Sequence, residues 1–359
     1  MSIDFASITQ PTLLVCRAIV ERNIKKMAAK LSNKTTFRPH FKTHQNLEIG
    51  NIFRKHGVTK IAVSSLDMAN FFAADGWDDI TISIPANLRQ IDQINELAKK
   101  INLSLIVDST ESAEFLLAHI KHPINLWLEI NVGQNRSGFD CDKIEEIKNC
   151  TDKILQKNHL IKLQGILTHA GHSYACKGEK EISDLYFETL KKLQKIKAAI
   201  ATKTWQPLIS FGDTPCCSVI KSFDEIDEIR PGNFVYFDIS QKEIGSCAQE
   251  DIAVAAALPV ISLHPERNEV VLYGGAVHLS KEFLEKDGQA NYGNIVTFKN
   301  DKWLALTEEN KIIRLSQEHG ILKSNPNFLK TLKIGDLIYV SPVHSCLTAD
   351  LLRNNTIIF

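Results

Sequence analysis

The 359-residue sequence lacks the features typical of nucleic-acid-binding, membrane-spanning and secreted proteins. It has 42 lysines and arginines against 42 aspartates and glutamates, so no basic field is available to hold nucleic acid or an anionic membrane. No apolar run approaches the roughly 18 residues that a membrane span needs. The first residues, 1–5, have neither a basic nor an apolar region, so we expect no signal peptide.

The cysteines also lack a disulfide pattern. The chain has eight of them, and their spacing matches no small disulfide-stabilised module. In a chain of this length they are most simply reduced thiols, which predicts a cytoplasmic protein.

What the sequence does contain is a regular alternation of strand-like and helix-like segments. Near-continuous apolar runs, typical of strands buried on both faces of a parallel sheet, alternate with amphipathic segments over roughly 230 residues. The runs are 36–40, 60–65, 79–85, 103–109, 125–132, 163–170, 207–214 and 227–233. Eight such units predict an α/β fold, a (β/α)8 TIM-like barrel. A doubly wound sheet alternates in the same way and stays an alternative, although no G-x-G-x-x-G follows the first run.

The alternation of strand-like and helix-like segments ends at about residue 241. From Ile252 onward, strand-like runs are separated by turn residues such as Asn268 and Gly335, with little helical periodicity. This predicts a second, mostly β C-terminal domain. We place the barrel at residues 10–243 and the β domain at 244–359, with residues 1–9 as a candidate addition to the β domain.

The first predicted strand leads into a stretch that sets one lysine between two histidines. Lys42 lies between His40 and His44, close to Arg38 and Pro39. A lysine here can be an ordinary surface residue, a phosphate clamp or an amine nucleophile. Because barrel active sites lie at the C-terminal ends of the strands, we interpret Lys42 as the nucleophile.

Other polar residues follow later strands of the predicted barrel. These residues are Asn131, Arg136, His169, His172, Tyr174, Gly212, Asp213, Thr214, Arg230, Gly232 and Asn233. Barrels often bind phosphate in the loops after strands seven and eight, where glycine lets the backbone approach an anion. The alternative is that Gly212–Thr214 and 231–233 are ordinary turns between strand and helix.

Near the C-terminus, His344 and Cys346 are two residues apart on a predicted strand or at its end. Residues i and i+2 share one face of a strand, so both side chains can reach one ion. Imidazole and thiolate together suit Zn²⁺ and leave coordination positions open for water and substrate. A buried cysteine beside a packed histidine is the simpler alternative.

Taken together, these motifs resemble those of the D-threonine aldolase and D-serine dehydratase family, whose members are alanine-racemase-like, fold type III pyridoxal-phosphate enzymes. The motifs are 38–44, 132–138, 169–174, 212–215, 230–233, 318–320 and 335–346, and they occur in the family's order. The segment 273–282 departs from the family pattern.

The resemblance implies roles for individual residues. Lys42 would hold pyridoxal 5'-phosphate by a Schiff base, Arg136 would lie near the 3′-oxygen, and either Tyr174 or Arg230 would contact the ring nitrogen. The residues expected around the cofactor are His169, Gly212, Asp213, Thr214, Gly232 and Asn233, and those expected to bind the metal are His344 and Cys346. The family also implies a homodimer that acts on a small D-amino acid.

The function expected from this resemblance is a lyase acting on D-3-hydroxy amino acids. The His-x-Cys pair resembles the dehydratase pattern, which predicts β-elimination to a keto acid and ammonia; the alternative is retro-aldol cleavage to glycine and an aldehyde. Weaker alternatives are a racemase, which needs no metal, and a non-enzymatic cofactor-binding protein, which needs neither the second domain nor the metal pair. A dinucleotide-dependent oxidoreductase is open on fold alone.

Overall fold

The computed structural model describes residues 7–157, 159–286, 288–307 and 309–359. The chain forms two compact units, which we treat separately. The barrel unit consists of Met27–Lys42 and Leu47–Gly232. The β unit consists of the N-terminal part up to Lys26 together with Thr43–Asn46 and Asn233–Phe359.

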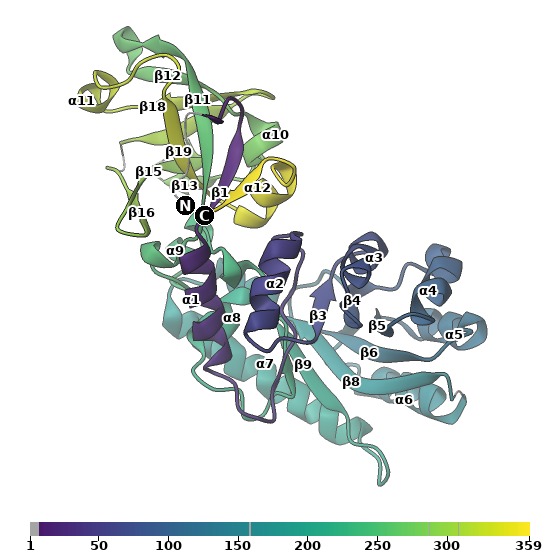
Figure 1. Cartoon of the computed structure of the whole chain (residues 1–359). Helices are drawn as coiled ribbons and strands as arrows, with labels where there is room; N and C mark the ends of the chain where they lie inside the picture. Colours follow the sequence, from purple (N-terminus) through teal and green to yellow (C-terminus); the bar gives the residue numbers. More distant parts are fainter. Residues whose placement is uncertain (1–6, 158, 287, 308) are drawn as a thin grey trace. The chain divides into compact units, whose positions relative to one another are not determined.

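The barrel unit confirms the predicted fold, because eight parallel strands follow one another around a curved sheet (Figure 1). In spatial order they are β2 (Thr36–Phe37), β10 (Glu228–Ile229), β9 (Leu208–Gly212), β8 (Ile161–His169), β6 (Ile124–Asn131), β5 (Asn102–Val107), β4 (Asp79–Pro85) and β3 (Ile61–Val63). A parallel bridge between His40 and Ala62 joins the segment after β2 to β3 and closes the ring. A short strand, β7 (Phe139–Asp140), pairs with β6.

Helices connect the strands of this unit, each with an apolar face toward the sheet. They are α2 (Leu47–Lys55), α3 (Leu66–Ala74), α4 (Ile91–Ala98), α5 (Thr110–His119), α6 (Ile144–Lys157), α7 (Glu179–Ile200) and α8 (Thr214–Val219). Serines begin two of them, since Ser65 accepts a hydrogen bond from Met68 N and Ser109 accepts one from Ser112 N. These caps fix where each helix starts after its strand.

A chain of polar side chains crosses the interior of the barrel unit. Arg38 forms a buried ion pair with Glu228 and a partly buried one with Asp79, with nitrogen–oxygen distances of 2.6 Å in both cases. The other oxygen of Glu228 accepts a 2.6 Å hydrogen bond from Ser210 Oγ. Ser210 in turn accepts a hydrogen bond from Arg230. Buried charges of this kind are stable only when each is paired, so the residues of this chain hold one another in place.

The β unit is built on a nine-stranded, mostly antiparallel sheet. Its strands, in order, are β12 (Glu269–Tyr273), β18 (His319–Lys323), β17 (Lys311–Leu315), β15 (Gly293–Lys299), β19 (Leu337–Pro342), β11 (Val254–His264), β1 (Thr12–Val15) and β20 (Thr356–Ile358), with β16 (Lys302–Ala305) beside β15. The hairpin β13 (Leu284–Lys286) and β14 (Gln289–Asn291) is separate. Strand β12 also pairs with β11, so part of the sheet closes on itself.

Strand β1 belongs to this sheet. The predicted barrel range 10–243 includes Thr12–Val15, whereas these residues pair antiparallel with β11 and parallel with β20 (Figure 1). The next helix, α1 (Arg17–Ala28), starts in the β unit and runs into the barrel unit. Among the described residues, no helix is both long and apolar enough to cross a membrane.

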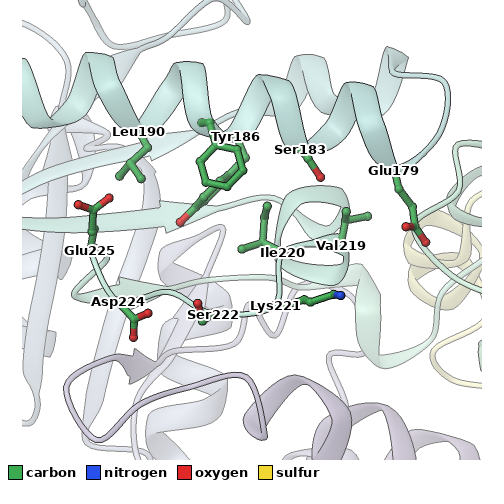
Figure 2. Close-up of a pocket in the computed structure, with 11 residues that line it drawn as sticks. Glu179, Ser183, Tyr186, Leu190, Val219, Ile220, Lys221, Ser222, Asp224 and Glu225 are labelled. Carbon is green, nitrogen blue, oxygen red and sulfur yellow. The ribbon is translucent and has the colours of Figure 1, made fainter.

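The barrel unit carries an open groove of about 580 Å³ between α7 and the segment after α8 (Figure 2). Side chains of α7, including Tyr186 and Leu190, face the segment that contains Val219 and Ile220. No predicted site residue is among the described residues that line this groove. This groove is therefore not where the predicted site residues lie.

Candidate active site

Lys42 lies in a tight turn directly after the closing bridge of the barrel, and its side chain is exposed. The preceding residue, Phe41, is completely buried, with its ring about 5 Å from those of Phe53, Phe72 and Trp77. Burying this ring stabilises the turn by a few kcal/mol, about the amount for one large apolar side chain. Packing of the Phe41 ring thus anchors the turn, while the Lys42 side chain remains exposed.

Three cations act on two histidines in the barrel unit. Burial, followed by the charges of Lys42, Arg230 and Arg136, lowers the pKa of His40 well below its usual value. Burial and the same three charges lower the pKa of His169 to about 3. Both imidazoles are therefore neutral at pH 7. The region carries excess positive charge and suits an anionic ligand.

Each imidazole is held in one orientation by the backbone. The Nδ1 atom of His40 accepts a hydrogen bond from Lys42 N at 3.3 Å. The Nδ1 atom of His169 lies 3.0 Å from the carbonyl oxygen of Gly212, so it carries the proton and donates. The Nε2 atom of His169 is thereby left as an acceptor.

The segment after β9 has unused polar atoms. Asp213 caps α8, and its Oδ1 accepts hydrogen bonds from Cys216 N at 2.7 Å and Ser173 Oγ at 3.0 Å. Burial raises the pKa of this carboxyl to about 6. Within the described part of the chain, Thr214 Oγ1 and Asp213 Oδ2 are buried without a hydrogen-bond partner. A buried hydroxyl of this kind is expected to have a ligand, and a phosphate oxygen would supply an acceptor.

Arg230 is fixed at the end of the interior polar chain. It is buried, and its Nη2 donates to the carbonyl oxygen of Thr168 at 2.7 Å. A Cβ atom at Gly212 would lie 3.0 Å from the same nitrogen, so glycine leaves room for the guanidinium. Burial lowers the pKa of Arg230 to about 10, which keeps it charged at neutral pH. Arg230 is thus a rigid positive charge beside the end of β9.

Arg136 and Tyr174 are, like Lys42, exposed members of the predicted set. Arg136 is 51% exposed, 4.0 Å from Glu129 Oε1. Its loop is ordered by Asn131, whose Oδ1 accepts hydrogen bonds from the backbone N–H groups of Gly133 and Asn135. Tyr174 is 39% exposed, and its ring centroid lies 6.3 Å from that of His169. The barrel unit therefore gathers Lys42, Arg136, His169, Tyr174 and Arg230 around the ends of its strands.

The predicted metal ligands lie in the β unit. His344 is the residue before α12 (Ser345–Leu351), and Cys346 is in the first turn of that helix. The strand geometry expected from sequence is therefore wrong, because β19 ends at Pro342. The two side chains still meet at the start of this helix, because a hydrogen bond to Cys346 is among the causes that raise the pKa of His344.

The surroundings of His344 fit a metal ligand. Its Nδ1 lies 2.6 Å from Glu282 Oε2, which leaves Nε2 for a metal. Carboxylates commonly orient metal-bound histidines in this way. Burial alone would lower the pKa of His344, but hydrogen bonds to Cys346 and Glu282 raise it to about 11. The only described group of three His, Cys, Asp or Glu side chains spaced to bind one ion is Asp140–Cys141–Asp142, so His344 and Cys346 form a pair and not part of such a group of three.

The sulfur of Cys346 has its own hydrogen-bonding shell within the β unit. Thr43 Oγ1 lies 3.2 Å from Sγ, and Asn233 Nδ2 donates to it at 3.4 Å. Asn233 also donates to Asp238 Oδ2 at 2.7 Å. The side-chain nitrogen of Asn233, expected near a phosphate, is thus committed to this shell, while its Oδ1 has no partner among the described residues.

Sequence reasoning missed Glu282, Thr43 and Asp238. Glu282 is 62 residues from His344, and no local pattern links the two. Its one signal is its place in the segment 273–282, which departs from the family pattern. Thr43 stands in the lysine motif itself, but its contact with Cys346 spans 303 residues.

Comparison with known proteins agrees with this architecture. The family model described as "Alanine racemase, N-terminal domain" matches residues 15–240. The chain belongs to this family. A second model, described as "Putative serine dehydratase domain", matches residues 253–358. The two matches together cover most of both units.

Curated relatives and solved structures extend the comparison. The chain is 29% identical to a D-serine dehydratase of Dictyostelium discoideum, over 96% of this chain and 92% of that protein. It is 27% identical to the D-threo-3-hydroxyaspartate dehydratase of Delftia sp. (strain HT23), over 92% and 88%. A solved structure of the Delftia enzyme has a TM-score of 0.87 at 24% identity, covering 96% of this chain and 93% of that chain, which shows a shared fold.

Proposed function

We propose that this protein is a pyridoxal-phosphate- and metal-dependent lyase that acts on D-3-hydroxy amino acids, with D-serine-dehydratase-type elimination as its main reaction. The curated relatives named as D-serine and D-threo-3-hydroxyaspartate dehydratases support this proposal. The observation that carries it is the pairing of His344 with Cys346, because a racemase in this family needs no metal. A keto acid and ammonia are the expected products.

The barrel unit suits pyridoxal 5'-phosphate. Lys42 is proposed to hold the cofactor through its amine. Thr214, whose hydroxyl has no partner among the described residues, is proposed to hold the phosphate together with Gly212 and Gly232. Bound there, the cofactor would accept electrons from the Cα atom of the substrate. Arg136, Tyr174 and Arg230 are proposed to orient its ring.

The β unit is proposed to hold Zn²⁺ through His344 Nε2 and Cys346 Sγ. A mixed nitrogen and sulfur donor set suits zinc, and the carboxylate of Glu282 orients the histidine. The bound ion would act as a Lewis acid on the β-hydroxyl of the substrate.

The proton from Cα is proposed to go to Lys42 Nζ. Two other nitrogen bases surround this amine, but His40 and His169 both have strongly lowered pKa values and bind protons poorly at neutral pH. The lowered basicity of both imidazoles therefore leaves Lys42 as the base of the cluster. A proton that stays on Lys42 does not return to Cα, so Cα is left free to form the double bond to Cβ.

Retro-aldol cleavage is the second candidate. A solved structure of D-threonine aldolase from Filomicrobium marinum has a TM-score of 0.82 over 97% of this chain, so the same fold accompanies a different reaction. At 20% identity this likeness shows the fold alone. The Cys346 thiol, where the aldolase pattern has an aspartate, favours elimination. We further propose a cytoplasmic location, since the described cysteines are all free thiols, and a homodimer, which the family resemblance implies.

One product assay tests the proposal. The protein is incubated with D-serine, D-threonine and D-threo-3-hydroxyaspartate, with and without a chelator. We expect a keto acid that disappears on chelation; glycine would indicate retro-aldol cleavage and an L-amino acid would indicate racemisation. Lys42→Ala should abolish turnover and the Schiff-base absorption. Lys180→Ala, which changes an exposed lysine on α7, is the matched control. Full activity in Lys42→Ala would refute the scheme.

A further inference from the structure

Two side chains form hydrogen bonds with the Cys346 sulfur, and each directly follows a proposed cofactor-binding residue in the sequence. Thr43 follows directly after Lys42, and Asn233 follows directly after Gly232. Their side chains reach the same sulfur, at 3.2 Å and 3.4 Å. Each proposed cofactor segment is therefore continuous with a residue that contacts the proposed metal thiolate.

The contact of Asn233 is fixed by a buried carboxylate. Asp238 Oδ2 accepts hydrogen bonds from the backbone N–H of Ser345 at 2.9 Å and from Asn233 Nδ2 at 2.7 Å. Because this oxygen is an acceptor, Asn233 must present its NH₂ group on that side. The same nitrogen then directs its remaining N–H toward Ser345 Oγ and Cys346 Sγ.

The contact of Thr43 depends on the state of the sulfur. Thr43 is 1% exposed, so its hydroxyl has little access to water. Either atom of the pair can donate while Cys346 is a thiol. A metal-bound thiolate has no proton, so only the threonine hydroxyl can then donate. Hydrogen bonds to an ionised acceptor are about twice as strong as neutral ones, so metal binding favours one orientation of the Thr43 hydroxyl.

We propose that Thr43 and Asn233 are positioning residues that hold Cys346 for the metal and couple metal binding to cofactor binding through Lys42 and Gly232. This inference rests on the proposed function. Fixing Lys42 to the cofactor restricts the backbone of Thr43, so less conformational freedom is lost when its hydroxyl binds the thiolate. Because such coupling is reciprocal, bound metal must then raise the affinity for the cofactor by the same factor.

The test uses Co²⁺ as a visible substitute for the metal. Co²⁺ affinity and the thiolate-to-cobalt absorption band are measured on the full-length protein with and without pyridoxal phosphate. In the unaltered protein we expect the cofactor to tighten Co²⁺ binding. Thr43→Val keeps the shape but removes the hydroxyl, so it should weaken binding by about 10-fold or more, shift the absorption band and abolish the effect of the cofactor. Thr43→Ser keeps the hydroxyl and should restore all three.

The control is Thr348→Val, which removes a buried hydroxyl from the same helix. That hydroxyl bonds to the carbonyl oxygen of Leu279, so Co²⁺ binding should be unchanged. An unaltered protein that binds no Co²⁺ would refute the proposed function. Normal Co²⁺ binding that is identical in Thr43→Val would refute only the coupling. If Thr43→Val does not fold, Thr43→Ala is measured against the same criteria.

Discussion

Replacing Asp213 by asparagine should flatten the pH dependence of barrel stability. Burial raises the pKa of this carboxyl to about 6, although Cys216 N and Ser173 Oγ donate hydrogen bonds to it. An aspartate in an unfolded chain has a pKa of about 3.9. The folded state therefore binds this proton more tightly, so the contribution to stability is fully present below about pH 4 and is lost as the pH rises through 6.

The size of the effect follows from the two pKa values. A difference of about 2 units, at about 1.36 kcal/mol per unit, gives about 3 kcal/mol between pH 4 and pH 8. Asparagine caps helices about as well as aspartate, so the cap at the start of α8 is retained. The amide does not titrate, so its own effect on the free energy of unfolding is the same at every pH. It therefore does not alter how the difference in unfolding free energy between the two proteins changes with pH.

Urea unfolding of the cofactor-free protein measures this difference. We expect the free energy of unfolding of Asp213→Asn, relative to the unaltered protein, to rise by about 3 kcal/mol from pH 4 to pH 8. Asp184→Asn is the matched control, because that carboxylate is 65% exposed on α7. A difference between Asp213→Asn and the unaltered protein that stays constant over the whole range would refute the reasoning.

Three further substitutions test other parts of the structure. Arg38→Met should destabilise the barrel unit to urea by about 3–5 kcal/mol, because Glu228 is left buried without its ion-pair partner; unchanged unfolding would contradict the interior polar chain. Glu282→Gln should weaken Zn²⁺ binding by about 10–100-fold in competition with a chromogenic chelator, and equal affinity would rule out its orienting role. Gly138→Ala should reduce cofactor absorbance, because a Cβ would lie 2.6 Å from Asn131 N at a φ of +104°; normal absorbance would show that the loop tolerates the change.

The barrel was predictable because its strands carry their own signal. Most are buried on both faces and read as short apolar runs, as in Leu103–Val107, which is almost completely buried. Strand β1 has the same appearance and is also followed by a helix, so local sequence cannot separate it from a barrel strand. Only its pairing with β11 and β20, more than 200 residues away, assigns it to the β unit.

Site residues that directly follow a strand could be predicted from the sequence. Contacts between distant segments could not. Lys42 and His169 stand at strand ends, which the alternation of strands and helices locates. The pairing of His344 with Cys346 was expected from spacing, but their positions at the start of a helix were not. Glu282 was not identified, because its contact with His344 is one that no sequence periodicity encodes.

The residues around Lys42 have separate structural roles. Arg38 belongs to the interior ion-pair chain, and Phe41 anchors the turn in an aromatic core. His44 is a structural histidine: it is 4% exposed, its Nδ1 accepts from Asn46 N, and burial lowers its pKa to about 3. Lys42 is the residue of this turn that the fold leaves exposed. Buried side chains flank Lys42 on both sides, while its own side chain stays exposed, as the proposed role in cofactor binding requires.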